Sequence, residues 1–413
     1  MAVIHWLELG ACLALLGCGA KAPEDTGGFQ LDPSHGECPA GYAIANTDYA
    51  STSISAISPT GAMLSPTVIS SGSAPPALTT ALSGDVIFPS SAPASGKLLL
   101  IDRYPNSVLT WVEPSTGSVL QQLPVGTGFA ANPHDYLEVA KDKAYVSRYE
   151  SNAAPGQMPF DEGGDLLVID PHANEITGRV ELASEPDGAF LPRPDQLLPV
   201  DDEVWVSLQR FDADFGTAGD ARLVGVDPSL DTTTWTLELP GVASCGGLTR
   251  SPSGKLVAVV CSGVASDVDS SGAPAPTSRS AVVLLDATVQ PPRELQRFDV
   301  AAQLGTQLGS TIAFASETLL VGVALGDAGA NLDDGAFTLD TSVGTAQPLL
   351  DAGAAFALGD VRCAPGCTDL CFLADAQANE LHVWQVADER LLEQDPVPAD
   401  SNVGLPPRAI GAL

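Results

Sequence analysis

The chain has 413 residues, of which 45% are hydrophobic and 17% charged, and it contains 40 Gly and 33 Pro. This composition can form a large core with many turns, whereas the low charged fraction argues against a helix-rich surface. The net charge of −33 at pH 7, from 51 acidic and 18 basic residues, excludes nucleic acid as a partner and favours cations or basic partners, or simply maintains solubility.

The N-terminal region is predicted to be an export signal. Residues 4–16 form an apolar stretch that is too short to cross a membrane as a helix. The following Leu15-Leu-Gly-Cys18 resembles a bacterial lipoprotein signal, although no Lys or Arg precedes it. A second cysteine, Cys12, has too little apolar sequence before it, and an ordinary buried helix is the alternative to a signal.

The resemblance to a lipoprotein signal has four implications. Residues 1–17 are removed, Cys18 carries the lipid, and residues 18–37 form a flexible tether. Gly19, directly after the lipidated cysteine, implies the outer membrane of a bacterial cell envelope. The protein is expected to be a monomer whose lipid is its only membrane contact, and the sequence leaves open whether it faces the periplasm or the cell surface.

From residue 38 onward the chain repeats one pattern. Aliphatic and β-branched runs meet a short turn and resume, which predicts β-hairpins. The turns recur at intervals of roughly 50–60 residues, a period typical of repeat folds. The seven turns are Ser58-Pro-Thr-Gly, Glu113-Pro-Ser-Thr-Gly, Asp170-Pro, Asp227-Pro, Asp286-Ala, Asp340-Thr and Ala387-Asp-Glu.

Six of the repeats are complete four-stranded units, such as the one with strands at residues 97–102, 107–113 and 118–123 after a preceding segment. The N-terminal strands, at residues 42–46, 52–58 and 62–69, lack an innermost strand. Residues 408–413 read as an innermost strand with nothing after it. Joining the two ends closes a ring, which protects the sheet edges. The predicted fold is therefore an all-β, seven-bladed β-propeller of four-stranded antiparallel blades with a shared closing blade.

The hairpins and the Asn132-Pro-His-Asp start of an inner strand carry a resemblance to known propellers. Residues 38–413 resemble the seven-bladed YVTN-repeat, lactonase-like and quinoprotein amine dehydrogenase-like group. The resemblance implies a fold and not a function, since such propellers include enzymes, binding proteins and scaffolds.

Six cysteines remain after export, an even number suited to disulfides outside the cytoplasm. Cys245 and Cys261 are expected on adjacent antiparallel strands, where they could pair. Cys38 is expected to bond to Cys363, Cys367 or Cys371, whose remaining two members then pair. The alternative is a metal site formed by those three cysteines and His382, although the closely spaced pairs of zinc modules are absent.

Three loops are acidic and rich in Gly, at residues 212–220, 267–272 and 326–335. The second begins like a calcium loop, with oxygen donors at alternate positions, but Ser278 stands where a bidentate Glu should close the cage. Calcium is therefore a weak expectation, and no other cofactor is predicted. Insertions between the second and third strands of a blade are the structural alternative.

The mouth of the central channel, formed by the starts of the innermost strands, is the predicted binding site. Charged side chains recur at this level of the blades, and convergent carboxylates could hold a cationic or metal-bridged ligand. The alternative is that these side chains connect one blade to the next. The predicted site residues are His134, Asp135, Arg193, Asp195, Asp360 and Arg408.

No catalytic motif is present in the sequence. It has no Gly-x-Ser-x-Gly, no His-Glu-x-x-His, no phosphate-binding loop with Lys, and only four His after the signal. The predicted function is therefore non-enzymatic binding of a protein, polymer or small ligand at the rim or channel mouth. The alternative is a metal-assisted, lactonase-like hydrolase that uses the channel carboxylates.

Overall fold

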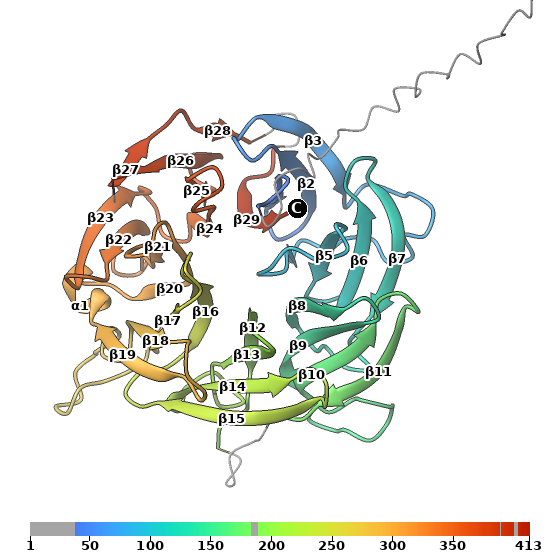
Figure 1. Cartoon of the computed structure of the whole chain (residues 1–413), viewed down its shortest axis with the longest axis horizontal. Helices are drawn as coiled ribbons and strands as arrows, with labels where there is room; N and C mark the ends of the chain where they lie inside the picture. The colour runs from blue at the N-terminus through green and yellow to red at the C-terminus, as the bar shows by residue number, and fades with distance from the viewer. Residues whose placement is uncertain (1–37, 183–188, 389, 400–403) are drawn as a thin grey trace, which may run out of the picture.

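The computed structural model describes residues 38–182, 189–388, 390–399 and 404–413. These residues form seven antiparallel sheets arranged as blades around a central axis (Figure 1). Each blade has four strands along its main path, which confirms the predicted seven-bladed β-propeller.

The inner strands line the axis, and the second strands pair with them. The inner strands, in chain order with the C-terminal one last, are β4 (Val86–Ile87), β8 (Pro133–Ala140), β12 (Pro194–Val200), β16 (Cys245–Arg250), β20 (Leu308–Phe314), β24 (Leu358–Cys363) and β29 (Pro407–Ala412). The second strands are β1 (Tyr42–Thr47), β5 (Leu98–Asp102), β9 (Lys143–Ser151), β13 (Glu203–Leu208), β17 (Leu256–Cys261), β21 (Leu319–Ala324) and β25 (Leu370–Asp375).

The third and outer strands complete each blade. The third strands are β2 (Thr52–Ile57), β6 (Val108–Glu113), β10 (Gly163–Asp170), β14 (Ala221–Asp227), β18 (Ala281–Asp286), β22 (Gly335–Asp340) and β26 (Glu380–Ala387). The outer strands are β3 (Met63–Ser70), β7 (Ser118–Pro124), β11 (Glu175–Val180), β15 (Thr232–Leu239), β19 (Arg293–Phe298), β23 (Thr345–Asp351) and β27 (Arg390–Glu393). Two short elements outside the repeat were not predicted, α1 (Val300–Leu304) and β28 (Val397–Pro398).

All seven predicted turns join a third strand to an outer strand. Their sequences favour this because an Asp at the end of the strand can accept backbone N–H groups of the turn. Asp170 Oδ1 accepts the N–H of His172 at 2.8 Å and that of Ala173 at 2.9 Å. Asp227 and Asp340 bond in the same way to the N–H two residues later.

The closing blade contains both ends of the repeat, as predicted, in the order β29-β1-β2-β3. The register pairs Tyr42 with Ala412 and Ile44 with Ile410. Backbone hydrogen bonds extend the pairing beyond the strands, from Ala40 N to Leu413 O at 2.7 Å and from Thr47 N to Pro406 O at 2.8 Å.

The core lies between neighbouring blades. The second and third strands are almost entirely buried, whereas the outer strands alternate between exposed and buried residues. One cluster joins the closing blade to its neighbour through Ile44, Ile57 and Phe372. Because each blade buries its faces against the next, closure of the ring completes the core.

Three disulfides agree with the predicted pairing. They also decide which of the three candidate cysteines bonds to Cys38. Cys245 pairs with Cys261 and Cys363 with Cys371, each bridge joining directly opposed residues of an inner and a second strand. Cys38 pairs with Cys367, across 329 residues of sequence. The thiolate site of Cys363, Cys367, Cys371 and His382 is thereby ruled out for this oxidised state, since disulfide sulfurs do not serve as thiolate ligands.

The signal peptide, Cys18 and the tether lie outside the described residues. Within the described part of the chain, no helix is long and apolar enough to span a membrane.

Candidate functional site

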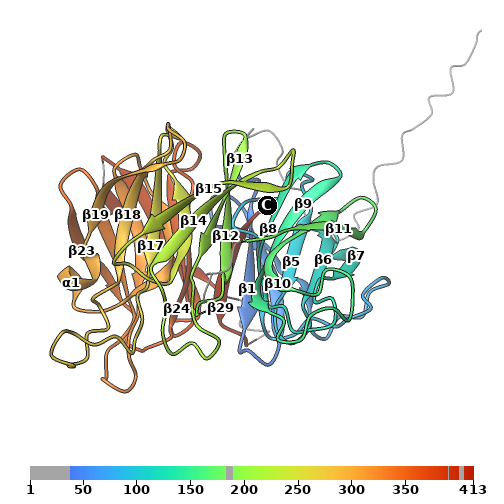
Figure 2. The ribbon, with the colours of Figure 1, turned by 90° about the horizontal axis from the view of Figure 1, so that it is seen from below.

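The two faces of the ring differ in their connections. The inner strands begin at one face, here called the mouth face, and the loops between second and third strands lie on it. The acidic loops at 212–220, 267–272 and 326–335 are among these loops, as predicted. They project from the lower side of the ring in Figure 2. The turns between third and outer strands lie on the opposite face.

His134 and Asp195 are brought together by neighbouring blades at the mouth. His134 Nδ1 lies 2.9 Å from Asp195 Oδ1, and the imidazole stacks on the Tyr149 ring with centroids 4.1 Å apart. Gln209 Nε2 donates to the other carboxylate oxygen, and Tyr149 donates to Gln209 Oε1 at 2.7 Å. Burial opposes ionisation of Asp195, but His134 and Gln209 hold its pKa below the usual value.

Asp135 does not point free into the channel. Its carboxylate accepts hydrogen bonds from Ser90 N at 2.8 Å, Ser90 Oγ at 2.5 Å, Leu197 N at 2.8 Å and Tyr136 N at 2.8 Å. Burial raises the pKa of Asp135 to about 6, against the effect of these donors. Asp135 therefore connects its own blade to the blades on both sides.

Asp135 belongs to a repeated set of contacts between inner strands. In each, a side chain of one inner strand accepts a backbone N–H from the next inner strand around the ring. The five acceptor and donor pairs are Asp135 and Leu197, Gln196 and Leu248, Thr249 and Phe314, Thr311 and Val361, and Asp360 and Ile410. For Asp135 and Asp360 the structure thus favours the blade-connecting role that was the alternative to ligand binding.

Arg193 is buried beside the pair of His134 and Asp195. Its Nη1 donates to Glu150 at 2.6 Å, and its guanidinium lies 3.8 Å from the centre of the Phe215 ring. Arg408, on the far side of the channel, lies 5.3 Å from the centre of the Tyr49 ring and donates through Nη1 to the carbonyl of Phe356. The predicted residues therefore form separate groups around the mouth.

The carboxylates predicted to converge at the mouth do not form a metal-binding group. In the described part of the chain, no three His, Cys, Asp or Glu side chains converge in a geometry that could hold a metal. The calcium-like loop is also occupied internally, because Asp267 accepts two hydrogen bonds from Arg279, at 2.8 and 2.7 Å. A metal-bridged ligand therefore has no support from this arrangement. Whether the mouth residues bind another ligand stays a prediction.

The sequence analysis missed an ion pair at the mouth. Arg103 donates through Nε and Nη2 to Asp85 Oδ1, at 3.0 and 2.5 Å. Three hollows, of about 380, 260 and 530 Å³, all include both residues in their walls. Asp85 and Arg103 flank β4 and β5, and their side chains meet only because these strands pair. No sequence motif marks them.

Exposed aromatic side chains also gather on the mouth face. Four of the exposed large hydrophobic side chains in the described residues are aromatic, and all four lie in mouth-face loops: Tyr49, Tyr104, Phe215 and Phe356. Gly84 allows the loop of Tyr49 to approach, since a Cβ at Gly84 would lie 2.2 Å from the Tyr49 carbonyl carbon. Aromatic and Arg side chains together are typical of binding surfaces.

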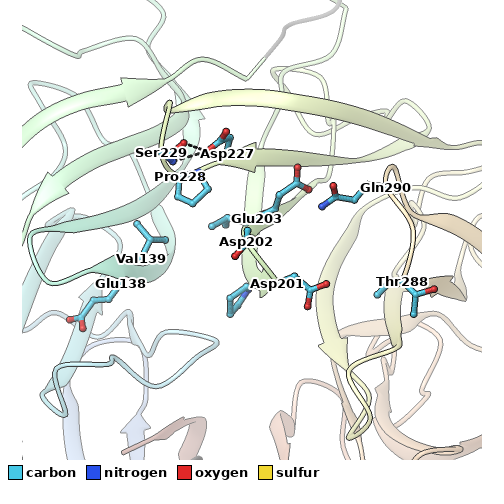
Figure 3. A pocket seen from close by; sticks show the side chains of 13 residues that line it. Glu138, Val139, Asp201, Asp202, Glu203, Asp227, Pro228, Ser229, Thr288 and Gln290 are labelled. Carbon is cyan, nitrogen blue, oxygen red and sulfur yellow. Dashed lines mark hydrogen bonds between the residues drawn. The ribbon is translucent and has the colours of Figure 1, made fainter.

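A hollow of about 930 Å³ lies on the opposite face (Figure 3). Acidic side chains dominate its wall: Glu138, Asp201, Asp202, Glu203 and Asp227. Several already bind neighbours, as Asp227 binds Ser229 and Glu203 accepts Trp235 Nε1 at 2.7 Å. Asp227 and Glu203 thus have structural roles, and, among the described residues, no buried side-chain atom without a partner lines this hollow.

The fold and the mouth define a seven-bladed β-propeller with an ion-paired, aromatic channel entrance. No protein-family model matches the chain, and no curated protein matches it.

Solved structures share its architecture. A protein from Lactobacillus plantarum has 11% identity and a TM-score of 0.59, over 90% of this chain and 99% of that one. The periplasmic gluconolactonase of Pseudomonas aeruginosa has 11% identity and a TM-score of 0.58, over 90% and 98%. A candidate 6-phosphogluconolactonase of Bacteroides fragilis has 11% identity and a TM-score of 0.57, over 92% and 100%. At such identities the likeness establishes the fold alone.

Proposed function

We propose that this propeller is a non-enzymatic binding protein that holds a small polar ligand at its channel mouth. The supporting observation is the convergence of three hollows on Asp85 and Arg103, beside exposed Tyr49 and Tyr104. A concave surface with aromatic walls and a few fixed polar groups is the usual form of a small-molecule site.

The expected location remains part of the proposal. Export and anchoring through Cys18 to the outer membrane of a bacterial envelope agree with the three disulfides, which persist in oxidising compartments. Monomeric protein with a free mouth face is the form proposed to bind.

Ligand screening with a pair of variants tests the proposal. Thermal shift and calorimetry with sugars, sugar acids, amino acids, choline, Ca²⁺ and Zn²⁺ should identify a ligand. Replacing Tyr49 and Tyr104 together by Ala should then weaken its binding at least about tenfold, because both rings border the hollows. Leu230→Ala, at a side chain 67% exposed on the opposite face, is the control. Equal affinity in both variants would place the ligand elsewhere.

One observation favours hydrolysis as a second candidate function. Because ionised Asp195 can only accept a hydrogen bond, His134 Nδ1 carries a hydrogen, and the lone pair of neutral His134 lies on Nε2. An imidazole oriented in this way can act as a general base on water. Turnover of a lactone such as δ-gluconolactone that falls about 100-fold in both His134→Ala and Asp195→Asn would establish a hydrolase and replace the binding proposal.

A further inference from the structure

The channel contains a small cavity below the mouth that could select the ligand. Its volume is about 260 Å³, and its wall includes four charged residues: Asp85, Arg103, Asp360 and Arg408. Pockets for drug-sized ligands measure roughly 300–1,000 Å³. This cavity therefore suits a smaller metabolite.

Arg408 has guanidinium donors that bind no described residue. Nη1 binds the Phe356 carbonyl, whereas Nε is buried and has no hydrogen-bond partner. Arg103 and Arg193 pair with Asp85 and Glu150, but Arg408 forms no ion pair among the described residues. Nη2 of Arg408 donates to no described residue, and Arg408 lines the cavity, so a ligand there that supplies an acceptor to Nη2 gains affinity. The guanidinium carbon lies 5.3 Å from the centre of the Tyr49 ring, within the range of a cation–π contact.

The neighbouring carboxylates of Asp85 and Asp360 already accept hydrogen bonds from the protein. Asp85 Oδ1 accepts two hydrogen bonds from Arg103, and its Oδ2 accepts the N–H of Tyr104 at 3.3 Å. Asp360 Oδ2 accepts the N–H of Ile410 at 3.1 Å. The two carboxylates and two guanidiniums of the wall cancel in charge, within a chain whose net charge is −33. An anion therefore meets less repulsion here than over the acidic surface.

The lysines of the described chain are confined to the opposite face, whereas arginines lie on both faces. The lysines of the described chain, Lys97, Lys141, Lys143 and Lys255, lie at turns between inner and second strands on the opposite face. The cations of the mouth are arginines. The planar guanidinium presents paired donors that match the two oxygens of a carboxylate, which an ammonium does not.

We propose that the channel cavity binds a small carboxylate ligand, with Arg408 as the group that holds the carboxylate and Arg103 at the cavity wall beside it. The proposal rests on the proposed binding function and specifies its ligand class. It replaces the cationic ligand expected from the carboxylates alone.

Calorimetric titration of the purified chain tests this ligand class. The probes are sodium gluconate, sodium succinate, inorganic phosphate, choline chloride and glucose. We expect at least one carboxylate to bind, and Arg408→Gln to weaken it at least about tenfold through loss of a charge-assisted hydrogen-bonded pair. Arg293→Gln, at a residue beside a turn of the opposite face, removes the same charge and should leave the affinity unchanged. A melting curve of each variant checks its fold, and Arg408→Lys substitutes for an Arg408→Gln protein that does not fold.

The remaining outcomes separate the two proposals. Carboxylate binding that is equal in wild type and folded Arg408→Gln, or binding of phosphate without any carboxylate, would overturn the ligand class. Binding of choline or glucose alone, sensitive to the Tyr49 and Tyr104 substitutions, would overturn it and leave the binding function intact. Absence of binding for every probe up to roughly 10 mM, which is weaker than any specific affinity expected for such a site, would reject both.

Discussion

The two faces of the ring use charge in opposite ways. On the mouth face, charged groups are buried and bind across blades, as Asp135 binds Ser90 and Leu197. On the opposite face, Asp227 and Asp340 sit in exposed turns and bind the backbone two residues away. The mouth face therefore combines stability with a site for ligands, whereas the opposite face mainly ends hairpins.

The connections between strands also differ between the two faces, in their length and in their residue types. The mouth-face loops are long enough to hold aromatic side chains such as Phe215 and Tyr104 beside the channel. The turns of the opposite face only reverse the chain direction. Their residues are therefore of the types that hydrogen-bond the backbone of the same turn. Variants on the two faces should accordingly separate effects on stability from effects on binding.

The largest expected effect is a loss of stability of the whole ring, caused by removal of its closing strand. Deleting residues 406–413 removes β29, which pairs with β1 and whose Ile410 N–H donates to Asp360. The opened ring exposes core on two blades, so we expect a fall in melting temperature of more than about 10 °C or failure to fold. A truncated protein that melts like the full chain would contradict closure of the ring through this strand.

The next largest effect on stability is expected from removal of a disulfide on the opposite face. Replacing Cys38 and Cys367 by Ser should cost about 2–4 kcal/mol in denaturant unfolding, because the bridge closes a very long loop. The control is the double Ser variant of Cys245 and Cys261, whose bridge spans 16 residues and should cost less. Ligand affinity should not change in the Cys38 variant, and a large loss would show that the two faces are coupled.

A third prediction concerns pH and the mouth face. The pKa of Asp135 is raised to about 6 by burial, so the folded state holds its proton more tightly than the unfolded state. Its contribution to stability is full below the unfolded pKa and is lost as the pH rises through about 6. Wild type should therefore lose stability relative to Asp135→Asn between pH 4 and 7, measured by urea unfolding. A constant difference across that range would contradict this assignment.

The smallest effect comes from the opposite face and has the reverse sign. Hydrogen bonds from Ser229 lower the pKa of Asp227, so its contribution is present above the unfolded pKa and lost as the pH falls. Asp227→Ala should reduce the melting temperature slightly at pH 7, less so at pH 3, and leave ligand affinity unchanged. A greater loss at pH 3 than at pH 7 would argue against this role.

The fold could be predicted because its signals are local and repeated. Each turn after a third strand carries its own Asp, Ser or Gly, and the incomplete ends at residues 42–70 and 407–412 complement each other. The short β4 carries little signal because only two of its residues pair. The disulfides followed from strand pairing, which places Cys245 opposite Cys261.

The sequence could predict where the site lies in the fold, but not which of its side chains contact one another. Alignment of the inner strands located His134 and Asp195 at the mouth, but not their contact, which depends on how two blades pack. The contacts of Asp135 could not be predicted for the same reason, since its donors come from blades before and after its own. Asp85 and Arg103 stand in ordinary turn sequence, and only the pairing of β4 with β5 brings them to the channel.

The bridge between Cys38 and Cys367 also determines how the molecule would carry a mechanical load. Cys38 precedes β1, and Cys367 lies in the turn between β24 and β25, on the face away from the mouth. A pull on the chain upstream of Cys38 would pass through the covalent bond into the neighbouring blade. It would not peel β1 away from β29, the strand pairing that closes the ring. That pairing is thereby shielded from tension applied at the N-terminal side of the propeller.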